Sequence, residues 1–188
     1  HADLTLPPYK HHPFATVSEA AASNSVTFMA PSKTFNMPGV QSSFAIVPDD
    51  GLRERFQAFM EAGEFSEGHL FAYIGCKAAF EHGEEWLEQV LAYIQGNIDF
   101  TETYLKEHIP SIGMIRPQAS YLIFLDCRAL GLGQEELEHL FADKARLALN
   151  SGTMFGEPGR GFMRLNVGCP RQQLRKALQQ LEMAVNMR

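Results

Sequence analysis

Short apolar stretches alternate with helical patterns in the first half of the chain. Residues 25–30 and 44–47 are rich in aromatic and β-branched side chains, and they predict two buried strands separated by a loop that contains Pro and Gly. The next apolar residues recur at helical spacing, at Leu52, Phe56 and Phe59. Residues 68–81 predict a second helix, and residues 83–108 predict a long third helix with a break near Gly96. Strands and helices are therefore expected to alternate.

The second half of the chain continues this alternation. Residues 119–126 and 161–167 are continuous strand candidates, and residues 134–149 carry an apolar face at helical spacing. Pro170 stands at the expected first position of a last helix, in which leucines recur every three or four residues. The pattern predicts a strand–helix–strand–helix unit, and the whole chain is expected to be an α/β protein.

The chain has 188 residues, of which 45% are hydrophobic and 20% are charged. This length is sufficient for one domain or for two small ones with a buried core. The best boundary lies inside the long predicted helix, so we expect one domain over residues 1–95 and a smaller α/β domain over residues 96–188.

Charge and apolar patterning argue against two classes of partner. Sixteen Lys and Arg stand against 22 Asp and Glu, and no basic cluster could follow a phosphate backbone, so we expect no nucleic-acid partner. No apolar run approaches the roughly 20 residues of a membrane helix, so we expect no membrane association. Cys76, Cys127 and Cys169 are odd in number and lie outside metal-ligand spacing, which favours a reducing, cytoplasmic compartment and no metal site.

The chain begins at His1 rather than at Met, and an apolar, Pro-bounded segment follows at once. This beginning is typical of a cut through a fold. We therefore expect a trimmed chain or a fragment from which part of an active site is absent.

Lys33 follows the first predicted strand, in a loop stiffened by Pro31 and Pro38 in which Gly39 allows close backbone approach. A solvated loop lysine is the ordinary interpretation, because lysine is nearly always exposed. The alternative is a partly desolvated amine that forms a Schiff base with a carbonyl cofactor. Spacing alone does not decide between the two.

Arg164 lies within a strand candidate between apolar neighbours, where an unpaired guanidinium would be costly to bury. It either reaches water or pairs with a carboxylate of the chain, or it forms a bidentate fork for a substrate carboxylate. Asn166 is expected on the same face of the strand, two residues further on.

Other motifs carry weaker signals. His1, His11 and His12 cluster near the start without a carboxylate or cysteine at metal-ligand spacing. Residues 156–161 (GEPGRG) lack the Lys-Ser/Thr ending of a phosphate loop, and they predict a flexible turn leading to Arg164. Ser32 lacks the flanking glycines of a nucleophile elbow.

Four ordered segments together resemble one family. They are APSKTFNMPG around Lys33, GEEWLEQVLAYIQGN (residues 83–97), RPQASYLIFLDCRALG (residues 116–131) and GFMRLNVGCPR (residues 161–171). In this order the segments are similar to the C-terminal half of fold-type I pyridoxal-phosphate enzymes, in the class I/II aminotransferase superfamily. Within it they resemble the MalY/PatB branch of cystathionine β-lyases, and the resemblance covers essentially the whole chain. It implies the last part of a large doubly wound α/β domain, followed by a small α/β domain.

The resemblance implies roles for six residues, at Lys33, Ser32, His1, Arg164, Asn166 and Asn36. Lys33 matches the lysine that holds pyridoxal 5'-phosphate as a Schiff base and then moves the α-proton of the substrate. Ser32 matches a position near the cofactor phosphate, and Arg164 matches the arginine that binds the substrate α-carboxylate. Asn36 and Asn166 are weaker candidates for the substrate pocket. His1 aligns with the last position of a motif whose aspartate pairs with the pyridinium nitrogen, and that aspartate would precede His1.

The chain departs from the aminotransferase pattern at two positions. Gln41 replaces an arginine that binds phosphate in many aminotransferases, and Ala30 replaces a serine three residues before the lysine. The departures weaken a simple aminotransferase assignment. Since the family's phosphate loop and ring-stacking aromatic belong to its first half, we expect this chain alone to be inactive.

The leading functional hypothesis is therefore a C–S β-lyase that converts cystathionine or related amino-acid substrates to pyruvate, ammonia and a thiol. An aminotransferase with the same cofactor is the first alternative, and a regulatory binding protein on the same fold is the second. The resemblance also implies that the parent protein is a homodimer.

Overall fold

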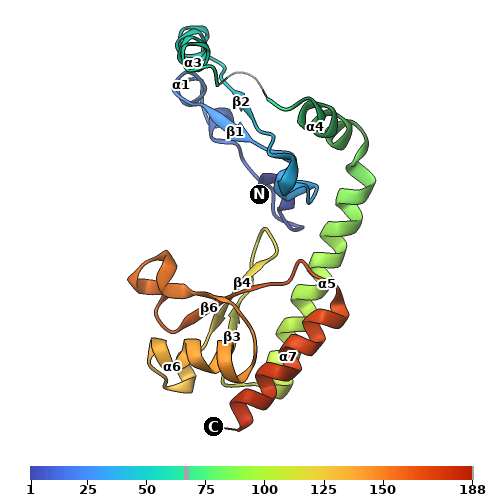
Figure 1. Cartoon of the computed structure of the whole chain (residues 1–188), viewed down its shortest axis with the longest axis vertical. Helices are drawn as coiled ribbons and strands as arrows, with labels where there is room; N and C mark the ends of the chain where they lie inside the picture. Colours follow the sequence, from blue (N-terminus) through green and yellow to red (C-terminus); the bar gives the residue numbers. More distant parts are fainter. Residues whose placement is uncertain (66–67, 188) are drawn as a thin grey trace. The chain divides into compact units, whose positions relative to one another are not determined.

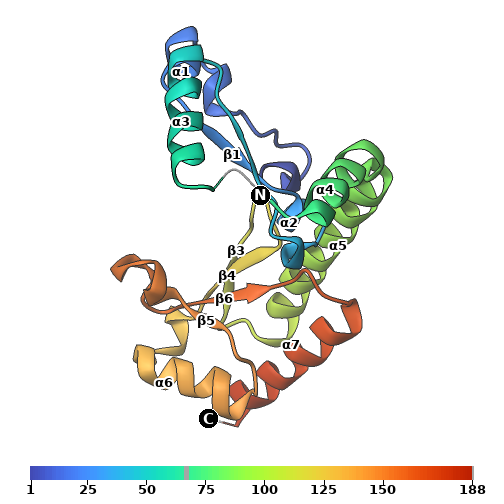
Figure 2. The ribbon, with the colours of Figure 1, turned by 45° about the horizontal axis from the view of Figure 1, so that its top comes forward.

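The computed structural model describes residues 1–65 and 68–187 of the chain. It divides into two compact units, His1–Val90 and Leu91–Arg188, which Figures 1 and 2 show in two orientations. The division falls inside the helix α5 (Glu84–His108). The assignment of residues 1–95 and 96–188 to a large and a small domain stays a prediction. No helix of the described residues combines the length and the apolar character needed to cross a bilayer.

The first unit consists of short helices around a two-stranded sheet. Its elements are η1 (Ala2–Leu4), η2 (Phe14–Thr16), α1 (Glu19–Ser23), β1 (Thr27–Met29), α2 (Pro31–Thr34), η3 (Pro38–Val40), β2 (Phe44–Ile46), α3 (Asp50–Ala62), α4 (Leu70–His82) and the start of α5. Side-chain caps fix two of the helix starts. Ser18 accepts a hydrogen bond from the backbone N–H of Ala21 at 3.1 Å, and Asp49 accepts one from that of Leu52 at 2.7 Å.

The two strands predicted in this unit are present, and they pair antiparallel with Thr27 opposite Ile46 and Met29 opposite Phe44. The prediction that both strands are buried is wrong for this chain, because Phe28 is 65% exposed and Ile46 is 46% exposed. Phe56 of α3 contacts Phe28, with ring centroids 6.1 Å apart, but this contact leaves Phe28 largely exposed.

The long helix is also present, but the break expected near Gly96 is wrong. The helix α5 runs without interruption over 25 residues. A glycine inside a helix weakens it without necessarily ending it. A Cβ built at Gly96 would lie 3.2 Å from Nη2 of Arg171, a tight contact with the end of a flexible side chain.

The second unit is a four-stranded antiparallel sheet with helices. Its elements after α5 are β3 (Gly113–Ile115), β4 (Leu122–Asp126), η4 (Arg128–Leu130), α6 (Gln134–His139), the π-helical turn η5 (Leu140–Lys144), β5 (Asn150–Ser151), η6 (Gly152–Phe155), η7 (Glu157–Gly159), β6 (Phe162–Asn166) and α7 (Arg171–Asn186). The strand order is β3-β4-β6-β5. The strands β4 and β6 confirm the two predicted ones, whereas β3 and β5 were not expected from the sequence.

The helix predicted over residues 134–149 ends early, at Lys144. Its last turn is wide, with the backbone N–H of Ala145 donating to the carbonyl of Leu140 at 2.9 Å. Arg146 then adopts a left-handed conformation with φ of 57°, which turns the chain toward β5.

The core of the second unit lies on one face of its sheet. Ile123, Leu125, Met163 and Leu165 alternate along β4 and β6 and are buried, together with the leucines Leu174, Leu178 and Leu181 of α7. Figure 1 shows α7 running alongside α5. The opposite face of the sheet carries Phe124, Arg164 and Asn166, which are less buried.

Candidate functional site

Lys33 lies in the short helix α2, directly after the strand β1. Ala30 is extended, and Pro31 at the first helical position sets the backbone for the turn. The segment therefore reverses immediately after the strand and places Lys33 in the last turn of α2. The residue is exposed in this chain, so the described residues do not supply the desolvation expected of a Schiff-base lysine.

An open pocket of about 240 Å³ surrounds Lys33. Its polar lining includes His1, Asp3, Ser32 and Ser43. The structure thus brings together three of the residues singled out from the sequence, His1, Ser32 and Lys33. The pocket provides an amine and hydroxyl groups, which suit a ligand that carries a carbonyl and an anionic group.

Thr34 anchors the helix that carries Lys33. Its side chain is buried, and its Oγ1 donates to Oδ2 of Asp3 at 2.8 Å. The bond joins η1 to α2 across 31 residues of sequence. Since Thr34 directly follows Lys33, this bond restrains the backbone that positions the lysine.

Aromatic side chains pack behind α2. Phe35 meets Phe80 edge-on with ring centroids 5.2 Å apart, and its centroid lies 6.1 Å from that of Trp86. Asn36 follows with a left-handed φ of 51°, is exposed, and is absent from the residues found to line the pocket. Its role in substrate binding stays a prediction.

Arg164 lies at the middle of β6 in the second unit. Its cross-strand neighbours are Phe124 on β4 and Asn150 on β5. Its Nη2 donates to Oδ1 of Asn150 at 2.7 Å, and its guanidinium carbon lies 4.7 Å from the ring centroid of Phe155. Within the part of the chain that the structure describes, Arg164 forms no ion pair. Pairing with one of the chain's own carboxylates, one of the alternatives from the sequence, is therefore not observed among these residues.

Asn166 shares the face of β6 that carries Arg164. The burial of β6 alternates, with Met163 and Leu165 buried and Asn166 exposed, as expected from the sequence. The Oδ1 atom of Asn166 accepts a hydrogen bond from the backbone N–H of Gly168 at 2.8 Å. The side chain therefore also shapes the turn that follows the strand.

The segment over residues 156–161 is a turn, as expected, and it is built from short helices. The 3-10 helices η6 and η7 place the backbones of Gly152 and Gly159 so close that a Cβ on Gly152 would lie 2.1 Å from the carbonyl oxygen of Gly159. Only glycine fits at this contact. The arrangement fixes Phe155, at the end of η6, over Arg164.

Cys127 and Cys169 are not activated nucleophiles. Burial raises the pKa of the Cys127 thiol to about 12, with a further contribution from the charge of Asp126. Burial also raises the pKa of the Cys169 thiol. Both thiols are therefore protonated at neutral pH. Across residues 1–65 and 68–187, no group of three His, Cys, Asp or Glu side chains is arranged to hold a metal ion.

Four contact residues escaped the sequence analysis, namely Asp3, Thr34, Asn150 and Phe155. Thr34 could have been suspected from its position beside Lys33. The roles of Asp3, Asn150 and Phe155 depend on contacts between segments that are distant in the sequence, and no local motif predicts such contacts.

A search with protein-family models found no match. Cystathionine beta-lyase PatB of Bacillus subtilis (strain 168) is 40% identical over 186 residues, which are 99% of this chain and 48% of that protein. A pyridoxal-phosphate-bound protein from Clostridium difficile 630 has a similar structure, with a TM-score of 0.95 and 38% identity over 99% of this chain and 48% of that one. Cystalysin from Treponema denticola, whose crystal structure contains pyridoxal 5'-phosphate, has a TM-score of 0.92 and 29% identity over 100% of this chain and 48% of that one.

The chain spans about half the length of the relatives it matches. Within that half, the similarity includes both units. The mixed helix and sheet arrangement is thus shared with the carboxy-terminal portion of these proteins.

Proposed function

This chain is homologous to the carboxy-terminal half of class I/II aminotransferase-fold proteins that use pyridoxal phosphate, and on that premise we propose that it belongs to a C–S β-lyase. The proposed reaction cleaves cystathionine or a related cysteine conjugate to pyruvate, ammonia and a thiol. The observation that carries the proposal is the position of Lys33, which follows a strand directly and lines a pocket with hydroxyl groups. The identity to PatB supports the lyase rather than another reaction.

The residues at this pocket fit one end of pyridoxal phosphate. The amine of Lys33 is accessible and would hold the cofactor through its aldehyde carbon, as a Schiff base. The hydroxyls of Ser32 and Ser43 are suitable donors for an anionic phosphate. His1 lines the same pocket and is proposed to lie near the ring.

Pyridoxal phosphate, when bound, supplies a ring that withdraws electrons from the α-carbon of an attached amino acid. The chain's own residues then have distinct tasks. With the cofactor bound, the amine of Lys33 would accept the proton from the α-carbon of the substrate. Arg164 binds the α-carboxylate with its planar fork and so restricts the orientation of the substrate. Asn166 and Asn36 are proposed to contact the substrate beside it.

With the cofactor bound, removal of the α-proton would allow the thiolate to leave from the β-carbon. Lys33 is the proton donor that the released thiolate can use, since it has just taken up the α-proton. Overall, one substrate molecule and one water would give the thiol, pyruvate and ammonia, so that the atoms balance.

Three further assignments belong to this proposal. Residues 1–95 contribute to the large cofactor-binding domain, and residues 96–188 form the small domain. The full-length protein is a homodimer and is cytoplasmic. Family resemblance supports the dimer, and the cysteine pattern supports the compartment.

The decisive experiment labels the cofactor lysine in the full-length gene product. Borohydride reduction after addition of pyridoxal phosphate, followed by peptide mapping, is expected to place the adduct on Lys33. Lys33→Ala should lose the visible absorbance and the labelled peptide. Lys77→Ala, which removes an exposed lysine of α4, should retain both. An adduct on another side chain, or on none, contradicts the proposal.

Product analysis distinguishes lyase from aminotransferase. Pyruvate released from cystathionine without a keto-acid acceptor supports the lyase. Strict dependence of turnover on an acceptor would instead establish the aminotransferase, while leaving the role of Lys33 intact.

A further inference from the structure

The environment of Arg164 contains a hydrogen-bond acceptor that carries no charge. Asn150 is the cross-strand partner of Arg164 in the pairing of β5 with β6, and its Oδ1 accepts from Nη2 of Arg164 at 2.7 Å. The Nδ2 of Asn150 lies 3.5 Å from Sδ of Met154, which orients the amide with its oxygen toward Arg164. One N–H of the guanidinium is thereby fixed by a neutral oxygen.

Two aromatic rings complete this environment. Phe155 lies on the guanidinium at 4.7 Å, and it meets Phe124 edge-on with centroids 5.5 Å apart. Phe124 is itself the cross-strand neighbour of Arg164 on β4. The guanidinium is therefore restrained in its plane by Asn150 and against one face by Phe155. An arginine has five N–H donors, so a fork held in this way can still bind a carboxylate with two of them.

The segment that carries Asn150 and Phe155 is tied to the rest of the unit. Gln134 of α6 donates to Oγ of Ser151 at 2.7 Å and accepts from the backbone N–H of Gly161 at 2.8 Å. It thus joins β5 to the residue that precedes β6. The close glycine contact between η6 and η7 holds the intervening loop. Asn150 and Phe155 are consequently placed by packing rather than by the ligand.

We propose that Asn150 is a positioning residue that orients Arg164 for the substrate carboxylate without neutralising its charge. This inference rests on the proposed function and deepens it. An aspartate at the same position would accept the same hydrogen bond, but its charge would pair with Arg164 and compete with an anionic substrate. The amide of Asn150 accepts the hydrogen bond that an aspartate would accept, but it carries no charge. The positive charge of Arg164 therefore stays available to an anionic ligand.

The charge argument gives a test that reads substrate binding and protein stability separately. In the full-length gene product, Asn150→Asp is expected to raise KM for the amino-acid substrate by about tenfold, with kcat within about twofold of wild type. The melting temperature is expected to stay unchanged or to rise, because an ion pair replaces a neutral hydrogen bond. Asn186→Asp adds the same charge at an exposed position near the end of α7. It should leave KM and the melting temperature unchanged.

A pair of inhibitors locates the effect at the carboxylate. One is a substrate analogue with an intact α-carboxylate, and the other is the same molecule with hydrogen in place of that group. Asn150→Asp should weaken binding of the first by about tenfold and leave binding of the second unchanged. Asn150→Ser, which keeps a neutral acceptor, should retain a KM closer to wild type than Asn150→Asp does.

Three results would overturn the inference. They are an unchanged KM in Asn150→Asp, an equal loss of affinity for both inhibitors, and a fall in melting temperature that accompanies the rise in KM. If wild-type protein labels at Lys33 and turns over substrate, such results overturn the inference alone. If wild-type protein forms no lysine adduct and shows no turnover, the proposed function fails, and the inference fails with it.

Discussion

The side chain of Asn97 accepts a hydrogen bond from Nε of Arg171 at 2.6 Å, in the interior of the second unit. The same amide donates to the backbone carbonyls of Val167 at 2.7 Å and Cys169 at 2.9 Å. Asn97 is fully buried. One polar residue of α5 therefore satisfies three groups in the connection between β6, which carries Arg164, and α7.

Replacing Asn97 with alanine should destabilise the protein substantially. Two carbonyl groups and one guanidinium N–H would lose their partners, and we expect the free energy of unfolding to fall by about 2 to 3 kcal/mol. Urea denaturation measures the change. Gln95→Ala is the matched control, because that side chain donates to the exposed Asp99, and it should have little effect. Equal stability of the two variants would contradict the assigned role of Asn97.

The bond between Thr34 and Asp3 can be tested by an isosteric change. Thr34→Val keeps the shape of the side chain but removes the donor to Asp3, and we expect a loss of about 1 kcal/mol in unfolding free energy. Thr34→Ser keeps the hydroxyl and should lose less hydrogen-bonding energy. If the bond also positions α2, borohydride labelling of Lys33 should be slower in the valine variant. Wild-type labelling in a destabilised variant would limit the bond to a structural role.

Glycine is required where η6 and η7 meet. Gly152→Ala would place a methyl group against the backbone of Gly159, and we expect a loss on the order of 2 kcal/mol in unfolding free energy. Gly113→Ala in β3 is the control, because its Cβ would meet Asp126 at an ordinary 3.5 Å. Thermal melts of the two variants compare them directly. A Gly152→Ala protein as stable as wild type would show that the loop accommodates the methyl group.

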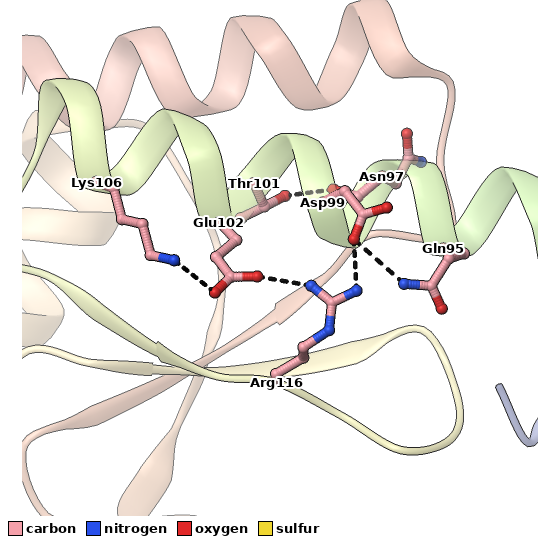
Figure 3. A network of polar contacts seen from close by, with 7 residues as sticks. All are labelled: Gln95, Asn97, Asp99, Thr101, Glu102, Lys106 and Arg116. Carbon is pink, nitrogen blue, oxygen red and sulfur yellow. Dashed lines mark hydrogen bonds and ion pairs between the residues drawn. The ribbon is translucent and has the colours of Figure 1, made fainter. Parts of the chain in front are cut away.

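A surface ion-pair network predicts how stability depends on acid. Figure 3 shows Arg116 between Asp99 and Glu102, with donor–acceptor distances of 2.5 and 2.6 Å. Hydrogen bonding to Arg116 lowers the pKa of Asp99, and hydrogen bonding to Lys106 and then to Arg116 lowers the pKa of Glu102.

Because the folded state lowers both pKa values, these carboxylates stabilise it at pH above their ordinary values of 3.8 and 4.5. That contribution is lost as the pH falls through the lowered values. Arg116→Ala should therefore lower stability at neutral pH and reduce the difference between neutral pH and about pH 2. The change should stay below about 1 kcal/mol, since Asp99 is 56% exposed and solvent screens the pair. Urea unfolding at both pH values measures the change. Lys176→Ala, at an exposed position of α7, is the control. Parallel pH profiles of stability for wild type and Arg116→Ala would contradict the prediction.

The longer helices and strands could be predicted because the apolar residues of each recur at helical spacing or form a continuous apolar run. The helix α5 and the strands β4 and β6 are examples. The strands β3 and β5 have three and two residues, so their conformation depends on pairing with β4 and β6 rather than on local preference. The helix predicted over residues 134–149 also ends early, at Lys144, because of non-local pairing. The left-handed turn at Arg146 directs the chain toward β5, which pairs with β6.

The candidate site divides in a similar way. The sequence singles out Lys33 and Arg164 because the segments around them resemble those of one family, and their roles stay predictions. It does not single out Asn150 and Asp3, because their importance depends on a cross-strand register and on a contact across 31 residues. The apolar pattern also gave a wrong prediction for the burial of Phe28, which is exposed. An apolar strand indicates a surface that another segment can cover, but it does not identify that segment.

The ring pair of Phe35 and Trp86 gives the first unit an optical label. Trp86 is the only tryptophan in the sequence. It contacts Phe35, which is two positions after Lys33. Selective excitation of indole fluorescence therefore observes the neighbourhood of the lysine with no background from the second unit. A chromophore attached to that lysine would quench the emission by energy transfer, so that a simple titration could follow its arrival.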